Sequence, residues 1–107
     1  MDPKVIKFEE VNMKGDKKVI ETLNALLARE LTVVSQYMVH AEKCDNWGYS
    51  KLHDVIQNRA KVEMKHAEIL IRRIIFLDGI PVVSELEKMR IGADIPQMFA
   101  NDHEAEI

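Results

Sequence analysis

Apolar residues recur at spacings of three and four between Asp16 and about Asp45, which is the period of an amphipathic helix. No glycine or proline interrupts this stretch, and aspartate favours the N-cap position that Asp16 would occupy. The apolar stripe consists of Val19, Ile20, Leu23, Leu26, Leu27, Leu31, Val34, Met38 and Ala41. The pattern therefore predicts one long helix over residues 16–45.

A second long helix is expected from residue 49 or 50 to Asp78. Asn46-Trp47-Gly48 breaks the first helix, and Gly79, followed by Pro81, closes the second. The apolar face of this second helix carries Val55, Ile56, Ala60, Leu70 and Ile74. Because a connection this short joins antiparallel neighbours, residues 16–79 are predicted to form a helical hairpin.

The segments on either side of the hairpin have weaker patterns. Residues 1–15 are charged and have no strong period, which indicates an N-terminal extension. Residues 80–93 read as an extended crossover, and Asp94 is placed to cap a short last helix with Pro96 in its first turn. Three residues of this last helix are expected to share a face: Met98, Phe99 and Glu106. Residues 80–107 are assigned to the same single domain as the hairpin.

Two acids and one imidazole interrupt the apolar stripes. Glu30 lies three residues after Leu27 and four before Val34, and Glu63 and His66 share a face because they are three residues apart. Antiparallel packing brings the middle of the first helix close to the middle of the second. Since buried charged groups are costly without compensation, and a metal ion would use all three side chains at once, the pattern indicates a metal site.

The apolar stripes are too wide for two helices to bury on each other, so one flank of each helix would stay exposed. We therefore expect an all-α fold in which two hairpins dimerise into a four-helix bundle. A twofold dimer would offer four glutamates and two histidines, which is the ligand set of a di-iron or di-manganese carboxylate site. Such oxygen and nitrogen donors suit iron and manganese.

Composition argues against nucleic-acid and membrane partners and is consistent with a cytoplasmic protein. A chain of 107 residues with a net charge of −3 fits one domain and has no basic footprint for nucleic acid. Two arginines divide the longest apolar runs, so no segment is expected to span a membrane, and the N-terminus lacks the apolar core of a signal peptide. Cys44 is the only cysteine and cannot close an intrachain disulfide, which is consistent with a reducing cytoplasm.

The other reactive side chains are expected to have structural or solvent-facing roles. Three histidines are expected to face solvent: His40, His53 and His103. Tyr37 is expected to pack in the core, and Cys44 to be inert near a helix end. The acidic residues of the tail are expected to be solvated: Asp102, Glu104 and Glu106.

Several groups of residues match one known family in the same order along the chain. They are Met13-Lys14-Gly15-Asp16 with Lys18-Val19-Ile20, Arg29-Glu30-Leu31-Thr32 with Gln36-Tyr37 and His40-Ala41, Asp45-Asn46-Trp47-Gly48-Tyr49, Glu63-Met64-Lys65-His66-Ala67, and Arg73-Ile74-Ile75-Phe76-Leu77-Asp78-Gly79-Ile80-Pro81, with a looser match through Arg90-Ile91-Gly92. On these residues the chain resembles the N-terminal half of a bacterioferritin, which belongs to the ferritin-like superfamily.

The resemblance implies roles for individual residues. Three of them match ferroxidase ligands of the family: Glu30, Glu63 and His66. Glu106 falls where the family has a glutamate ligand on its third helix, and Tyr37 matches a tyrosine beside the di-iron centre. Met64 matches the methionine that, one from each of two subunits, ligates an intersubunit haem b. Met64 points about 100° away from its neighbour Glu63 on the helix, which suits an interface between hairpin pairs.

The chain also departs from the family pattern. A bacterioferritin continues for two more long helices, the second of which brings another Glu-x-x-His, whereas this chain ends at Ile107 with half of that ligand set. Asn58 and Val62 stand where some members place a histidine and an aspartate that hold iron on the inner wall of the cage. We therefore expect the homodimer to restore the ligand count, whereas the sequence does not predict whether a cage forms.

The expected function is oxidation of Fe(II) by oxygen or peroxide, with iron storage or detoxification as its purpose. Glu30 of each chain would be a terminal ligand, Glu63 the bridge and His66 the nitrogen donor. Two alternatives stay open. One is a haem-binding electron-transfer module that uses Met64, and the other is a non-catalytic partner that co-assembles with a full-length bacterioferritin.

Overall fold

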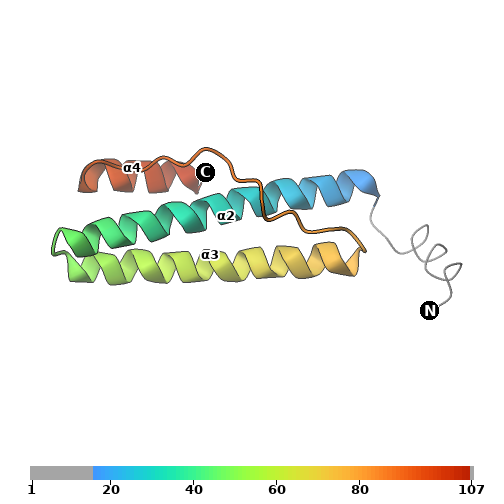
Figure 1. The fold of residues 1–107 in the computed structure, drawn as a ribbon, viewed down its shortest axis with the longest axis horizontal. Coiled ribbons are helices and arrows are strands. Elements are labelled where there is room, and N and C mark those ends of the chain that lie inside the picture. The colour runs from blue at the N-terminus through green and yellow to red at the C-terminus, as the bar shows by residue number, and fades with distance from the viewer. Residues whose placement is uncertain (1–15, 107) are drawn as a thin grey trace, which may run out of the picture.

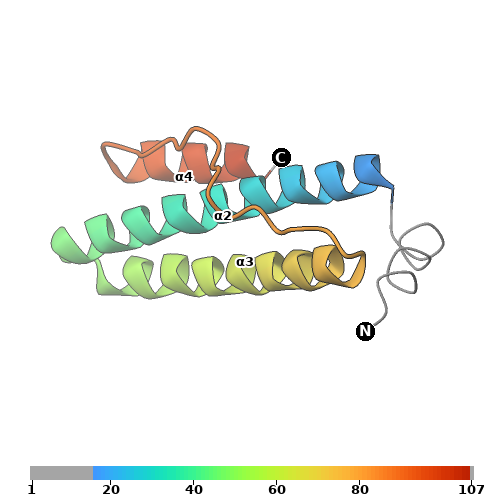
Figure 2. The ribbon, with the colours of Figure 1, turned by 45° about the vertical axis from the view of Figure 1, so that its right-hand side comes forward.

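The computed structural model describes residues 16–106, which contain three α-helices and no strand. Helix α2 spans Lys17–Asn46, helix α3 spans Ser50–Phe76 and helix α4 spans Ile95–Ala105. Figures 1 and 2 show α2 and α3 side by side as a long antiparallel hairpin, with α4 along α2 on the side away from α3. The predicted all-α hairpin is confirmed. The extension predicted over residues 1–15 lies outside the described residues.

The hairpin begins and turns where the sequence predicts. The Val19 N–H donates a hydrogen bond of 2.9 Å to Oδ1 of Asp16, which is the predicted N-cap. Helix α2 ends at Asn46, one residue later than expected, and Gly48 adopts a φ of 85° that only glycine reaches without strain. Only three residues connect the two helices, so α3 must return along α2.

Helix α3 ends at Phe76, two residues earlier than expected. The left-handed position after it belongs to Asp78, with a φ of 61°, and not to Gly79. The Gly79 N–H donates to the Ile74 carbonyl at 2.9 Å, which completes a Schellman-type end. Gly79 is needed for close packing instead, because a Cβ there would lie 2.8 Å from Cγ2 of Ile20.

Two apolar clusters fill the hairpin. The larger one comprises Val33, Tyr37, Ala41, Cys44, Ile56, Ala60 and Met98. The smaller one comprises Leu27, Ala67 and Ile74. Glu30 lies between the two clusters along α2, and Glu63 lies between them along α3. The acidic group therefore interrupts the core in the middle of both helices, as the stripes predicted.

Part of each predicted stripe is exposed. Leu26 is 46% exposed, Met38 56% and Val55 54%, so the single hairpin leaves these members of the stripes uncovered. Helix α2 packs against α3 on one side and α4 on another, and the crossover also runs along it. The exposure of these stripe residues agrees with the expectation that two helices alone cannot bury the stripes. None of the helices in residues 16–106 is long and apolar enough to cross a membrane.

The crossover between α3 and α4 is extended, as predicted, and runs along α2. Four backbone N–H groups of the crossover donate to polar side chains on one face of α2. The pairs are Val82 to Asn24 Oδ1 (2.8 Å), Glu87 to Thr32 Oγ1 (2.7 Å), Arg90 to Gln36 Oε1 (2.9 Å) and Gly92 to His40 Nε2 (2.8 Å). These side chains therefore satisfy a segment that has no regular backbone partner.

Helix α4 begins as predicted and packs differently from the prediction. Asp94 accepts a hydrogen bond of 2.9 Å from the Gln97 N–H, and Pro96 lies in the first turn. Met98 is 1% exposed whereas Phe99 is 48% exposed, so these two residues do not share a face. The reason is geometric, because consecutive residues of an α-helix point about 100° apart.

The prediction that His40 faces solvent was wrong. His40 is fully buried, with Nδ1 2.8 Å from Oδ1 of Asp102, and Gln36 Nε2 donates to the same oxygen at 3.0 Å. Asp102 is 9% exposed, so this acid belongs to the core and not to a solvated tail. His53 is half-buried, with its Nδ1 2.9 Å from a backbone carbonyl of α2, and only His103 is exposed as expected.

Candidate metal centre

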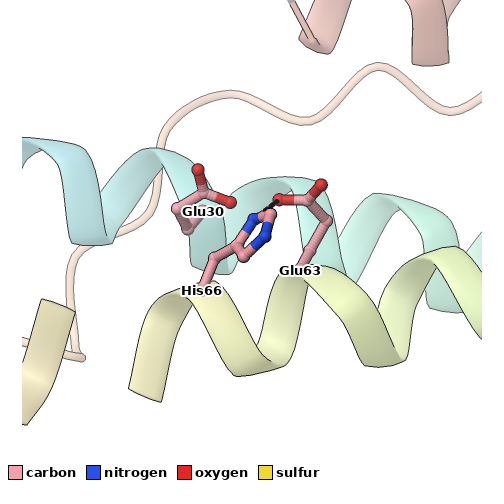
Figure 3. Close-up of side chains that lie close together, drawn as sticks. All are labelled: Glu30, Glu63 and His66. Atoms are coloured by element: carbon pink, nitrogen blue, oxygen red, sulfur yellow. Dashed lines mark hydrogen bonds and ion pairs between the residues drawn. The ribbon is translucent and has the colours of Figure 1, made fainter. Parts of the chain in front are cut away.

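Glu30, Glu63 and His66 converge between α2 and α3. Each offers one ligand atom, and these three atoms all lie within 4.8 Å of one another. Figure 3 shows Glu30 at α2 with one carboxylate oxygen turned towards Glu63 and His66, whose side chains rise from consecutive turns of α3. The antiparallel hairpin thus produces the grouping predicted from the spacing. Among residues 16–106, no other cluster of three or more histidine, cysteine, aspartate or glutamate side chains is placed to hold a metal ion.

The two carboxylates are removed from water to different degrees and are incompletely paired. Glu63 is 8% exposed, and Glu30 is partly buried. Oε2 of Glu30 is a buried oxygen that has no hydrogen-bond partner in residues 16–106. Because leaving a buried acceptor without a partner is unfavourable, this carboxylate is suited to bind a cation.

His66 is more exposed than the sequence suggested. Its side chain is 52% exposed in the single chain, so the expectation of a buried imidazole was wrong at this level of assembly. Nδ1 of His66 lies 3.3 Å from Oε2 of Glu63. Because an ionised carboxylate only accepts hydrogen bonds, Nδ1 carries the proton in this contact, and the lone pair of Nε2 is available to another group.

The two acids do not ionise alike. Burial, followed by the neighbouring Glu63 carboxylate, raises the pKa of Glu30 to about 7. Burial acts in the same direction on Glu63, but its contacts with Glu30 and His66 outweigh burial and lower the pKa of Glu63. Near neutral pH Glu30 is therefore only partly ionised in the metal-free chain, and a divalent cation would offset the negative charge of the two carboxylates.

The donor set fits a transition-metal ion. Two carboxylates and one imidazole supply oxygen and nitrogen ligands, which suit iron and manganese, and they leave coordination positions open. The carboxylate of Glu30, one of these donors, has the oxygen without a hydrogen-bond partner. A single hairpin, however, supplies only three such side chains within reach of one another.

Comparison with known families agrees with this arrangement. The sequence profile of the family described as "Ferritin-like domain" matches residues 20–107, which is most of the chain. The chain belongs to the ferritin-like domain family.

Relatives of this ferritin-like chain carry related names. It is 44% identical over 95 residues to "Bacterial ferritin" of Paramagnetospirillum magnetotacticum, covering 89% of this chain and 58% of the relative. It is 42% identical over 95 residues to "Bacterioferritin" of Streptomyces coelicolor, covering 89% and 57%. It is 48% identical over 80 residues to "Bacterioferritin" of Rhodobacter capsulatus, covering 75% and 50%. The chain thus spans between half and three fifths of the relatives' lengths.

Glu106, which the family resemblance marked as a ligand, does not belong to the group of Glu30, Glu63 and His66. The Tyr37 hydroxyl donates a hydrogen bond to Oε1 of Glu106, and Nη2 of Arg59 lies 3.9 Å from the same oxygen. Burial, followed by this hydrogen bond, raises the pKa of Tyr37. The tyrosine is 1% exposed, so the prediction that it packs in the core is confirmed.

Three other residues named from the sequence lie at the surface of α3. Met64 is 40% exposed and does not join the group of Glu30, Glu63 and His66. Asn58 and Val62 are exposed, and together with Arg59 and Glu63 they line a cavity of about 330 Å³. Through Glu63, this cavity adjoins the group of Glu30, Glu63 and His66.

Sequence reasoning missed two sets of residues around the centre. Arg59 was not singled out, although it lies four residues before Glu63 and therefore on the same side of α3. The polar face of α2 was also missed. Its members recur at intervals of eight and four, which was the available signal: Asn24, Thr32, Gln36 and His40.

Proposed function

We propose that this chain is an iron-binding ferritin-like protein that oxidises Fe(II) at a di-iron carboxylate site built between two copies. The observation that carries the proposal is the grouping of Glu30, Glu63 and His66, whose ligand atoms lie within 4.8 Å of one another. Oε2 of the same Glu30 carboxylate is buried without a hydrogen-bond partner in residues 16–106, and a bound cation would give this carboxylate a partner.

The second copy follows from the ligand count. One hairpin contributes two carboxylates and one imidazole, and a twofold pair would contribute four carboxylates and two imidazoles, enough for two metal ions. Two-metal sites hold their ions about 3.5–4 Å apart, so that one oxidant meets both. In this arrangement Glu30, Glu63 and His66 of each chain would hold the ions, with Glu30 expected as a terminal ligand, Glu63 as the bridge and His66 as the nitrogen donor.

Exposed apolar side chains on both long helices support pairing of hairpins. Large apolar side chains of α2 and α3 are between 40% and 64% exposed in the single chain. They include Val19, Leu26, Met38, Val39, Val55, Val62, Ile69, Ile75 and Phe76. Exposed apolar surface on this scale favours association. Covering it would also remove the half-exposed His66 from water, which strengthens its interaction with a cation.

The chemistry asked of the protein is limited. Fe(II) is the substrate and supplies the electrons, and oxygen or peroxide accepts them. The side chains bind and orient the metal ions. A cation that binds Glu30 displaces any proton on this carboxylate, because carboxylate ligands bind metals in the ionised form. The names of the relatives suggest storage or detoxification of iron as the purpose.

The test combines metal content with solution mass. We expect one iron per chain after anaerobic Fe(II) titration and a mass of a dimer or a multiple of dimers. Glu63→Ala should abolish Fe(II)-dependent oxygen consumption, whereas Glu68→Ala, an exposed acid on the same helix, should leave it unchanged. A monomer without metal, or oxygen consumption that persists in Glu63→Ala, would overturn the proposal.

A haem-binding role is the second candidate. Met64 is 40% exposed and lies outside the metal group, so its thioether is accessible to a ligand shared between two hairpins. Electron transfer through such a haem would give a red protein with the absorption spectrum of bis-methionine haem. Met64→Leu should remove that spectrum, and a preparation that takes up no haem would exclude this role.

The third candidate is a partner subunit. Because residues 16–106 bring only three donor side chains together, a full-length bacterioferritin subunit is an alternative source of the remainder. Co-expression with such a protein should then give mixed assemblies of defined mass. Separate homogeneous assemblies would exclude this candidate.

A further inference from the structure

Glu106 is a third carboxylate at the edge of the metal group. It follows the last residue of α4 as the C-cap, and its side chain is 35% exposed. Burial and Glu63 account for most of the rise in the pKa of Glu30, but the charge of Glu106 adds to it. After burial, Glu30 and His66, Glu106 also acts on the pKa of Glu63, which it lowers through a side-chain contact, so Glu106 adjoins the group without being one of its three members.

Two side chains hold Glu106 in this position. The Tyr37 hydroxyl donates to Oε1 of Glu106, and the Arg59 guanidinium lies 3.9 Å from the same oxygen. The guanidinium carbon of Arg59 also lies 5.7 Å from the centroid of the Tyr37 ring, within the range of a cation–π contact. Arg59 thus contacts both the acid and the residue that hydrogen-bonds to it.

Open space lies on both sides of this contact. Arg59, Tyr37 and Glu106 line a cavity of about 260 Å³. Arg59 and Glu63 line the neighbouring cavity of about 330 Å³. The side chain of Arg59 is 59% exposed, so both partners of the ion pair have room to separate.

We propose that Arg59 holds Glu106 aside in the metal-free chain and competes with a bound cation for this carboxylate. This inference rests on the proposed metal function and assigns Arg59 as a positioning residue, which acts through Glu106 and touches no metal. When a divalent cation occupies the group of Glu30, Glu63 and His66, Glu106 leaves Arg59 and contributes its charge to the cation. Because an exposed ion pair is weak, the exchange is energetically accessible.

A double-mutant cycle tests the competition. The dissociation constant for Mn(II), which binds without being oxidised in the absence of oxygen, is measured by calorimetry for wild type, Arg59→Met, Glu106→Gln and the double variant. We expect Arg59→Met to bind Mn(II) about two- to fivefold more tightly, the range that an exposed ion pair provides. Arg59→Lys should restore the wild-type constant, because the charge is retained.

A control variant separates two effects of Arg59 on Mn(II) binding: competition with the metal ion for Glu106, and simple repulsion between a positive side chain and the metal ion. Lys61→Met removes an exposed positive charge two residues away on the same helix. In the Glu106→Gln background, Arg59→Met should change the constant no more than Lys61→Met does. The near-ultraviolet absorption of Tyr37 supplies a second readout. It should change on Mn(II) addition in wild type and not in Glu106→Gln, because the acceptor of the Tyr37 hydroxyl moves only in wild type.

The outcomes are distinguishable. Weaker binding in Arg59→Met, or an equal effect of this substitution with and without Glu106, would overturn the inference and leave the proposed metal function standing. Absence of any Mn(II) or Fe(II) binding by wild type would overturn both. Helical circular dichroism of each variant shows that it folds, and this is expected because Arg59 is largely exposed.

Discussion

His40 joins the crossover to the hairpin through Gly92. Nε2 of His40 accepts a hydrogen bond of 2.8 Å from the Gly92 N–H, while Nδ1 lies 2.8 Å from Oδ1 of Asp102 on α4. An imidazole that donates from one nitrogen and accepts at the other is neutral. This single buried ring therefore connects three segments of the chain, namely α2, the crossover and α4.

Replacing His40 should destabilise the fold more than replacing any exposed histidine. His40→Ala leaves the Gly92 N–H and an oxygen of Asp102 without their partner in the interior, and it opens a cavity. We expect the free energy of unfolding in urea to fall by about 3 kcal/mol. His103→Ala, at an exposed position of α4, should change it by less than about 0.5 kcal/mol. Equal effects would show that the His40 contacts contribute little.

The elements that the sequence predicted depend on local signals. The stripe of α2, the Asp16 cap, the Asp94 cap and the short turn are each encoded within a few neighbouring residues. The grouping of Glu30, Glu63 and His66 needs one further step, the antiparallel pairing that the short turn imposes. For this reason both the hairpin and the composition of the candidate site were accessible before the structure.

The contacts that the sequence did not predict are long-range. His40 and Asp102 are 62 residues apart, and the backbone that His40 binds belongs to a segment without any periodic pattern. A polar side chain on a helix reads as solvent-facing until the chain that covers it is placed. The exposure of His66 and Leu26 has the related cause that a stripe reveals which residues are apolar but not how many neighbours arrive to cover them.

Glu30→Gln should stabilise the metal-free protein at high pH. The pKa of Glu30 is raised to about 7, chiefly by burial and then by Glu63. A pKa that is higher in the folded than in the unfolded protein gives a contribution that is present at low pH and is lost as the pH rises through about 7. The variant should therefore exceed wild type by about 1 kcal/mol near pH 8 and by less near pH 5 in urea unfolding without metal. A difference that is independent of pH would contradict this.

Gly92→Ala should disrupt the docking of α4. A Cβ at Gly92 would lie 2.5 Å from the backbone nitrogen of Met98, which cannot move without shifting the helix. We expect a loss of more than about 2 kcal/mol in the free energy of unfolding. Gly48→Ala is the comparison, because its φ of 85° costs about 1–2 kcal/mol while a Cβ there meets nothing within 4 Å. Near-equal losses would argue against the close approach.

Metal should stabilise the folded protein by mass action if the group of Glu30, Glu63 and His66 binds it. At a free Mn(II) concentration 100 times the dissociation constant, the gain is about 2.7 kcal/mol, provided the unfolded chain does not bind. We expect the melting temperature to rise on addition of Mn(II) and to return on chelation. Glu63→Ala should lose this rise and Glu68→Ala should keep it.

If the site spans two hairpins, the rise in melting temperature should also grow with protein concentration, since metal binding and pairing of hairpins then occur together. A rise that is independent of protein concentration would place the metal within one hairpin, with Glu106 or solvent supplying the missing ligands.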